Sequence, residues 1–229
     1  MGGLRYTSGF PDRPPVRVGV SLGDTLASLY GTIGALLALQ HRRNGGGGQF
    51  IDVALYESVF AIMESLVPEF SVQGFVRERS GASLPGIAPS NTYLCGDGLY
   101  VAIAGNGDAI FRRLMTAIGR TDLADDPALA GNAGRVAQVQ RIDDAIGQWT
   151  GQHTLEQVLD VLEAAAVPAG RIYTAADIVA DPHYQARGMI EPHTLPDGQP
   201  VSLPGVVPQL SATPGATRWI GPALGEHTD

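Results

Sequence analysis

Apolar residues in the first part of the chain recur with helical spacing. In residues 25–40 they occupy nearly every face of a helix, with Asp24 as a potential N-cap, so this helix should be enclosed by other elements. A His-Arg-Arg tripeptide and four glycines at residues 45–48 end it. These glycines follow a helix and precede an expected strand, the reverse of the order in a phosphate-binding loop, which predicts a simple connection.

The following segment is expected to contain one strand and one helix before regular structure ends. Residues 50–53 are typical of a short strand, and residues 59–67 carry the apolar stripe of a helix that bends or ends near Pro68. All periodicity is then lost over residues 73–90. A connection of that length is either a functional loop or a linker.

The second half of the chain predicts a small α+β unit. Residues 91–95 and 99–103 flank a Gly-Asp-Gly turn, which indicates a β-hairpin. Three helices should follow, and their signals are a cap at Asp108, an apolar period over residues 136–149 and a capping box of Thr154 with Gln157.

Shorter elements are expected nearer the C-terminus. Residues 171–173 indicate a strand and residues 177–180 a helical turn, and two short strands at residues 189–191 and 201–203 flank a Pro-Asp-Gly turn. These patterns divide the chain into three parts, residues 1–75, 76–190 and 191–229.

Composition limits the partners that we expect. All 15 basic residues are arginines, set against 23 acidic ones, and they are dispersed, which argues against nucleic acid. The uncharged stretch of residues 25–40 is shorter than the roughly 20 residues that span a bilayer, so we expect a buried core helix and no membrane partner. No targeting segment is visible at the N-terminus. The single cysteine, Cys95, suits a reducing compartment, so we expect a cytoplasmic protein.

Metal and nucleophile chemistry find little support in the sequence. The five histidines lie far apart without the spacing of metal ligands, so no metal site is expected. No serine lies in a GxSxG elbow, and Cys95 falls inside a predicted hairpin arm. We also expect no permanently bound cofactor.

Four residues are candidates for substrate binding. Gly81, Pro85 and Gly86 lie in the irregular segment of residues 73–90, which can fold over a ligand or serve merely as a linker between domains. Asn106, between two glycines at the end of a predicted strand, can orient a carboxylate or thioester oxygen, or can cap the turn through its own side chain.

Several ordered motifs resemble those of the family III CoA-transferases. They include Val-Arg-Val-Gly-Val-Ser-Leu-Gly-Asp at residues 16–24, Gly-Gln-Phe-Ile-Asp-Val-Ala-Leu at residues 48–55 and Leu-Gly-Glu-His-Thr at residues 224–228. The similarity continues through Ala-Pro at residues 88–89, Asn106 and Val-Pro-Ala-Gly at residues 167–170, so it covers essentially the whole chain. This family includes formyl-CoA transferases, carnitine CoA-transferases and the related 2-methylacyl-CoA racemases.

The resemblance implies an α/β protein overall, the C-terminal part of a family III CoA-transferase fold. Residues 1–75 would be a helical remnant of a Rossmann-like large domain, residues 76–190 a loop and small α+β domain, and residues 191–229 an extended tail returning to the large domain. The parent enzyme would be an interlocked homodimer. The apolar faces of residues 26–39 and 59–67 would then be covered by a missing half or by a partner subunit.

The resemblance also implies covalent chemistry on a carboxylate. In the family an aspartate attacks the acyl-CoA, the thiolate attacks the resulting anhydride to form an enzyme-bound CoA thioester, and an acceptor carboxylate takes the CoA. CoA thioesters and carboxylates are therefore substrates. By resemblance that aspartate precedes the segment matching residues 1–4, so the catalytic residue is unknown here and we expect a fragment that is inactive alone. Gly81, Pro85 and Gly86 match a covering loop of the family in place, not in sequence.

Two further functions remain as alternatives. Racemases of the group carry a carboxylate next to the position of Gly107, whereas transferases commonly show an asparagine like Asn106, which favours a CoA-transferase over a 2-methylacyl-CoA racemase fragment. The other alternative is a noncatalytic oligomerisation or CoA-ester-binding module.

Overall fold

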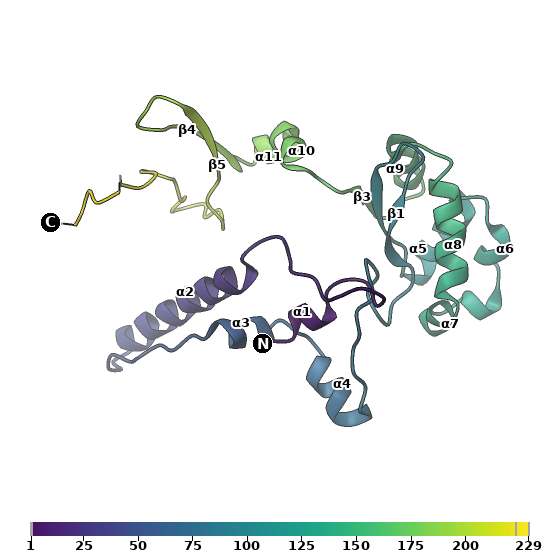
Figure 1. The fold of residues 1–229 in the computed structure, drawn as a ribbon, viewed down its shortest axis with the longest axis horizontal. Coiled ribbons are helices and arrows are strands. Elements are labelled where there is room, and N and C mark those ends of the chain that lie inside the picture. The colour runs from purple at the N-terminus through teal and green to yellow at the C-terminus, as the bar shows by residue number, and fades with distance from the viewer. Residues whose placement is uncertain (1, 223, 229) are drawn as a thin grey trace. The chain divides into compact units, whose positions relative to one another are not determined.

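The computed structural model describes residues 2–222 and 224–228 and forms two compact units, Met1–Gly170 and Arg171–Asp229 (Figure 1). The first unit contains the long helices and a small α+β subdomain. The second contains two short helices and a hairpin. The expected boundaries near residues 75 and 190 stay predictions.

The first unit begins with helices, of which the second is the longest. They are α1 (Leu4–Thr7), α2 (Leu22–Arg43), α3 (Leu55–Phe60) and α4 (Leu66–Gln73). The basic tripeptide lies in the last turn of α2, where positive charge is favourable, as predicted. Asp24 lies inside the first turn rather than at the N-cap, which is Ser21.

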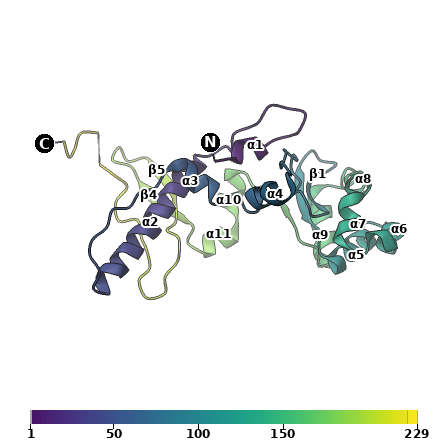
Figure 2. The same cartoon turned by 90° about the horizontal axis from the view of Figure 1, so that it is seen from below.

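The expectation that α2 is a buried core helix is wrong within this chain. None of its described residues is buried, and Leu36 and Leu37 are 61% and 64% exposed. Helix α3 packs beside it, but it covers only one side of so apolar a helix (Figure 2). With its charged ends included, the 22-residue α2 is also long and apolar enough to cross a membrane by length and composition.

Two local predictions after α2 are also wrong. Residues 50–53 form no strand, because a strand needs a partner and none of the described strands pairs with their backbone. The single helix expected over residues 59–67 is divided between α3 and α4, with Glu64 at a positive φ of 52° between them. Pro68 lies in the first turn of α4, where its missing N–H leaves no helical hydrogen bond unmade.

The subdomain is built on a three-stranded sheet in the order β1 (Ser90–Leu94), β2 (Tyr100–Ala104), β3 (Ala169–Arg171). The first two strands form the predicted antiparallel hairpin, with Tyr93 opposite Val101. That pair belongs to the core, whereas the small side chains of Ser90 and Ala104 belong to the other face.

Helices cover only the core face of this sheet, as Figure 1 shows. They are α5 (Asp108–Ala117), α6 (Thr121–Ala124), the 3-10 turn η1 (Pro127–Leu129), α7 (Asn132–Ala137), α8 (Val139–Thr150) and α9 (Leu155–Ala164). The helix predicted over residues 136–149 is thus two helices that meet at Gln138. The capping box of Thr154 and Gln157 is confirmed at the start of α9.

The second unit contains α10 (Ala175–Ala180), α11 (Pro182–Ala186), β4 (Ile190–Thr194) and β5 (Pro200–Pro204). The strands β4 and β5 form the predicted antiparallel hairpin. Thr174 and Asp177 form a capping box on α10, and Asp181 caps α11. The strand expected at residues 171–173 lies two residues earlier, as β3.

Candidate functional site

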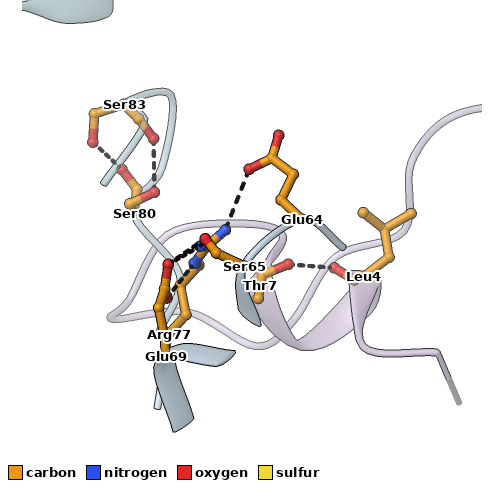
Figure 3. Close-up of polar contacts among 8 residues, drawn as sticks. All are labelled: Leu4, Thr7, Glu64, Ser65, Glu69, Arg77, Ser80 and Ser83. Carbon is orange, nitrogen blue, oxygen red and sulfur yellow. Dashed lines mark hydrogen bonds and ion pairs between the residues drawn. The ribbon is translucent and has the colours of Figure 1, made fainter. Parts of the chain in front are cut away.

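The irregular segment of residues 73–90 is fastened first through Arg77 (Figure 3). Its guanidinium donates two hydrogen bonds to the Glu69 carboxylate of α4 and a third to the Ser65 hydroxyl at 2.9 Å. Glu64 lies 3.6 Å from the same group. The hydrogen bonds that Glu69 accepts from Arg77 and from the Ser65 hydroxyl lower the pKa of the Glu69 carboxyl. The beginning of the loop is therefore held against α4 by an ionic network.

Gly81 marks a second point of attachment. The backbone N–H of Gly81 donates to the carbonyl of Gly9 at 2.9 Å, and Arg79 donates to the carbonyls of Tyr6 and Phe10. Gly81 has a φ of +69°, and a Cβ there would lie 2.8 Å from the Phe10 ring. A side chain at this position would be strained by the backbone and would have to displace the Phe10 ring, which favours glycine.

The tip of the loop is a closed turn with an exposed end. The Ser80 hydroxyl donates to the Ser83 carbonyl at 2.7 Å, and the Ser83 hydroxyl donates to the Ser80 carbonyl at 2.8 Å (Figure 3). Pro85 and Gly86 follow in an exposed turn, and Gly86 has a φ of +84°. Both serine hydroxyls are thus committed to backbone acceptors and shape the loop.

Asn132, the first residue of α7, holds the far end of the loop. Its amide nitrogen donates to the Gly86 carbonyl at 2.9 Å, and its amide oxygen accepts from the Ala88 N–H at 3.1 Å. This pair of bonds reproduces what a neighbouring strand would offer the loop backbone. The segment from Arg77 to Ala88 is therefore tied at several points, unlike a free linker.

Arg135, one turn along α7, is a completely buried arginine that the sequence interpretation missed. Its guanidinium donates hydrogen bonds to the carbonyls of Ala88 (2.9 Å), Asn106 (2.7 Å), Leu129 (3.1 Å) and Ala130 (3.2 Å) and to the Asp108 carboxylate (2.7 Å). It also lies over the Phe111 ring, 5.1 Å from the centroid. No local pattern reveals it, because most of these acceptors lie far from it in the sequence.

Asn106 interacts with Arg135 through its backbone carbonyl rather than its side chain. The hydrogen bond that fixes its turn uses the carbonyl oxygen, and α5 is capped by Gly107 without a side-chain bond. The side chain of Asn106 is half-buried. The structure thus links Asn106 and Gly86 through one helical turn of α7, whereas Gly81 is held by the N-terminal segment.

A groove of about 370 Å³ lies over the uncovered face of the sheet. Its lining consists of Ala82 of the loop and uncharged residues in or next to the three strands, namely Ser90, Asn91, Thr92, Ala102, Ile103, Ala104, Pro168, Ala169 and Gly170. The groove carries no charged side chain. It can accept an extended, largely uncharged part of a ligand beneath the loop.

The described parts of the chain contain neither a reactive thiol nor a metal site. Burial and the Asp97 carboxylate raise the pKa of the Cys95 thiol, which keeps it protonated and unreactive at neutral pH. Within residues 2–222 and 224–228, no cluster of three His, Cys, Asp or Glu side chains could hold a metal ion.

Comparison with known proteins identifies the family. Residues 1–228 match the family model of CoA-transferase family III. The chain is 47% identical over 227 residues to a succinyl-CoA–D-citramalate CoA-transferase of Chloroflexus aurantiacus and 32% identical over 228 residues to a succinyl-CoA:mesaconate CoA-transferase of Haloarcula hispanica. Each match includes 99% of this chain but only 56% and 57% of the respective relative. The chain therefore spans about half the length of these relatives.

The fold is that of a solved relative. A CAIB/BAIF family protein from Brucella suis superposes with a TM-score of 0.79 at 34% identity, over 99% of this chain and 58% of that one. The α/β class expected from the sequence is confirmed by this likeness. With the sequence match along nearly its whole length, the chain belongs to CoA-transferase family III.

Proposed function

We propose that the whole protein is an acyl-CoA:carboxylate CoA-transferase. The observation that carries this proposal is the 47% identity, along 227 residues, to a transferase named for succinyl-CoA and D-citramalate. Two other relatives are also named for succinyl-CoA, with L-malate or mesaconate, and another is named for succinate and glutarate. We therefore propose succinyl-CoA as the donor and a small dicarboxylic acid as the acceptor.

The reaction that we propose is a covalent exchange on a carboxylate. An enzyme carboxylate attacks the thioester carbonyl, CoA leaves as the thiolate, and this thiolate attacks the enzyme side of the anhydride, releasing the donor acid. An acceptor carboxylate then repeats these steps in reverse and leaves as its CoA thioester. The loop of Gly81, Pro85 and Gly86 would cover the enzyme-bound thioester and exclude water, and Asn106 would line the same site.

The test is an assay of the whole protein with succinyl-CoA and a panel of small dicarboxylates, followed by chromatography of the CoA esters. A new acyl-CoA, formed with release of succinate, is the expected result. Exchange of an α-proton in deuterated buffer without transfer would instead show a racemase. Binding of CoA esters without either reaction would show a noncatalytic module.

We further propose that polypeptide of an interlocked homodimer covers α2. Its uncharged part, residues 25–40, is about 24 Å long at 1.5 Å per residue, short of the roughly 30 Å hydrocarbon layer of a membrane. Leu37→Glu, on its exposed apolar face, should lower the molecular mass of the whole protein in light scattering, whereas Gln140→Glu on α8 should not. An unchanged mass for Leu37→Glu would contradict the proposal.

A cytoplasmic location is part of the same proposal. The single cysteine is buried and unpaired, as suits a reducing compartment. Fractionation of cells that express the whole protein should recover it with the cytosol, and recovery with washed membranes would contradict both this location and the protein cover of α2.

A further inference from the structure

We propose that Asn132 is a positioning residue that sets where the loop of residues 81–86 closes, an inference that rests on the proposed transferase function. The side chain lies on α7, outside the loop and outside the groove. It acts only through the backbone groups of Gly86 and Ala88.

The first step of the argument is the burial of the group that Asn132 satisfies. Ala88 is completely buried, so water cannot readily replace the amide oxygen that its N–H now meets at 3.1 Å. Without that acceptor the residue would have to move or carry an unsatisfied donor. The position of Ala88 is therefore coupled to the Asn132 side chain.

The second step is that a neighbouring residue extends the attachment to the chain segment that leaves the hairpin at the same end. Arg135, three residues after Asn132 on the same helical face, binds the carbonyls of Ala88 and Asn106. Ala88 precedes β1 and Asn106 follows β2. One turn of α7 thus fixes both chain segments that enter and leave the β1–β2 hairpin.

The third step is the geometry of the loop itself. Gly81 and Gly86 both have positive φ, at 69° and 84°, and the tip between them contains Ala82, which lines the groove. Such glycines let a short tip pivot at its two ends. Because the Gly81 end is held by Gly9, the Gly86 end, held by Asn132, decides where the tip rests.

A loosened tip has a consequence that a general loss of stability does not have. If the tip covers an enzyme-bound thioester, a displaced tip admits water, which hydrolyses the thioester to free CoA and the enzyme carboxylate. The ratio of CoA hydrolysis to CoA transfer should therefore rise. A misplacement of about 1 Å can also reduce the rate of transfer by up to about 100-fold.

The experiment compares variants of the whole protein. Asn132→Ala removes both hydrogen bonds, whereas Asn132→Asp keeps the acceptor for Ala88 and loses the donor to Gly86. Gln140→Ala is the matched control, because it removes another helical side-chain amide that makes a hydrogen bond, to Asp144 at 2.8 Å. Release of free CoA and formation of the product CoA ester are measured together, with hydrogen exchange of the Ala88 amide.

We expect Asn132→Ala to raise the ratio of hydrolysis to transfer about tenfold and to speed hydrogen exchange at the Ala88 amide. Asn132→Asp should show a smaller change in both measurements, and Gln140→Ala should match the wild type. A ratio within about twofold of the wild type in both folded Asn132 variants overturns the proposal, and if Asn132→Ala does not fold, Asn132→Asp alone decides. A wild-type protein that transfers no CoA would refute the proposed function. In that case the exchange rate at Ala88 still decides whether Asn132 fixes the loop.

Discussion

The Nη2 atom of Arg135 lies 2.7 Å from the backbone carbonyl oxygen of Asn106. The same atom donates to the Asp108 carboxylate, so one guanidinium corner holds the turn that joins β2 to α5. Arg135 has no exposed surface, whereas the Asp108 side chain is 70% exposed. The buried carbonyl acceptors, rather than the ion pair, therefore account for most of what this arginine contributes to stability.

Replacing Arg135 should test that division. Arg135→Met leaves four backbone carbonyls without their donor and should reduce the free energy of unfolding by about 3 kcal/mol or more. Asp108→Asn keeps those bonds and should cost less than about 1 kcal/mol, because the carboxylate is exposed. Urea unfolding of both variants measures the difference, and equal losses would show that the ion pair dominates.

Gly134 should tolerate no side chain. A Cβ at this position of α7 would lie 1.8 Å from the carbonyl oxygen of Ala128, a backbone atom that cannot turn aside. We expect Gly134→Ala to destabilise the protein by about 1–3 kcal/mol. Gly147→Ala in α8 meets nothing within 4 Å and should instead stabilise it by up to about 1 kcal/mol. Thermal unfolding distinguishes the two, and a stabilising Gly134→Ala would refute the close approach of α7 and η1.

Tyr93 should make stability fall at high pH. Burial, then the hydrogen bond from its hydroxyl to Asp143 at 2.6 Å, raise the pKa of the phenol well above its usual value. The folded protein therefore keeps a proton that the unfolded chain releases near pH 10, so this contribution is present below about pH 10 and is lost as the pH rises further.

The Tyr93→Phe variant measures that contribution. It should lose about 1 kcal/mol of stability at pH 7, where the hydrogen bond is missing, and its stability should decline less steeply than that of the wild type above about pH 10. Tyr100→Phe, on the exposed side of the neighbouring strand, serves as the control. Parallel pH profiles for wild type and Tyr93→Phe would contradict the prediction.

The rate at which a thiol reagent labels Cys95 should measure unfolding of the protein rather than reactivity of the native thiol. Its thiol is buried and its pKa is raised by burial and by Asp97, so a thiol reagent should react with it far more slowly in the native protein than in denaturant. Cys95→Ala gives the background rate. Rapid native labelling would show that this end of the hairpin opens readily.

The sequence correctly predicted those elements that are determined by residues close together in the chain. The hairpin of β1 and β2, the capping box of Thr154 and Gln157 and the β4–β5 hairpin all arise from turn or cap residues within a few positions of one another. The predicted strand at residues 50–53 failed because a strand also needs a distant partner.

The sequence alone determined the family and the α/β class, since ordered motifs extend along the whole chain. It also marked Gly81, Pro85, Gly86 and Asn106 as candidates, a choice that remains a prediction. Only the tertiary structure could show that two residues of α7 bind the backbone carbonyls of two of these candidates. Asn132 binds Gly86, 46 positions away in the sequence, and Arg135 binds Asn106, 29 positions away. The physical reason is that backbone carbonyls are identical at every residue, so no residue type in the sequence signals which of them a buried arginine or an asparagine will bind.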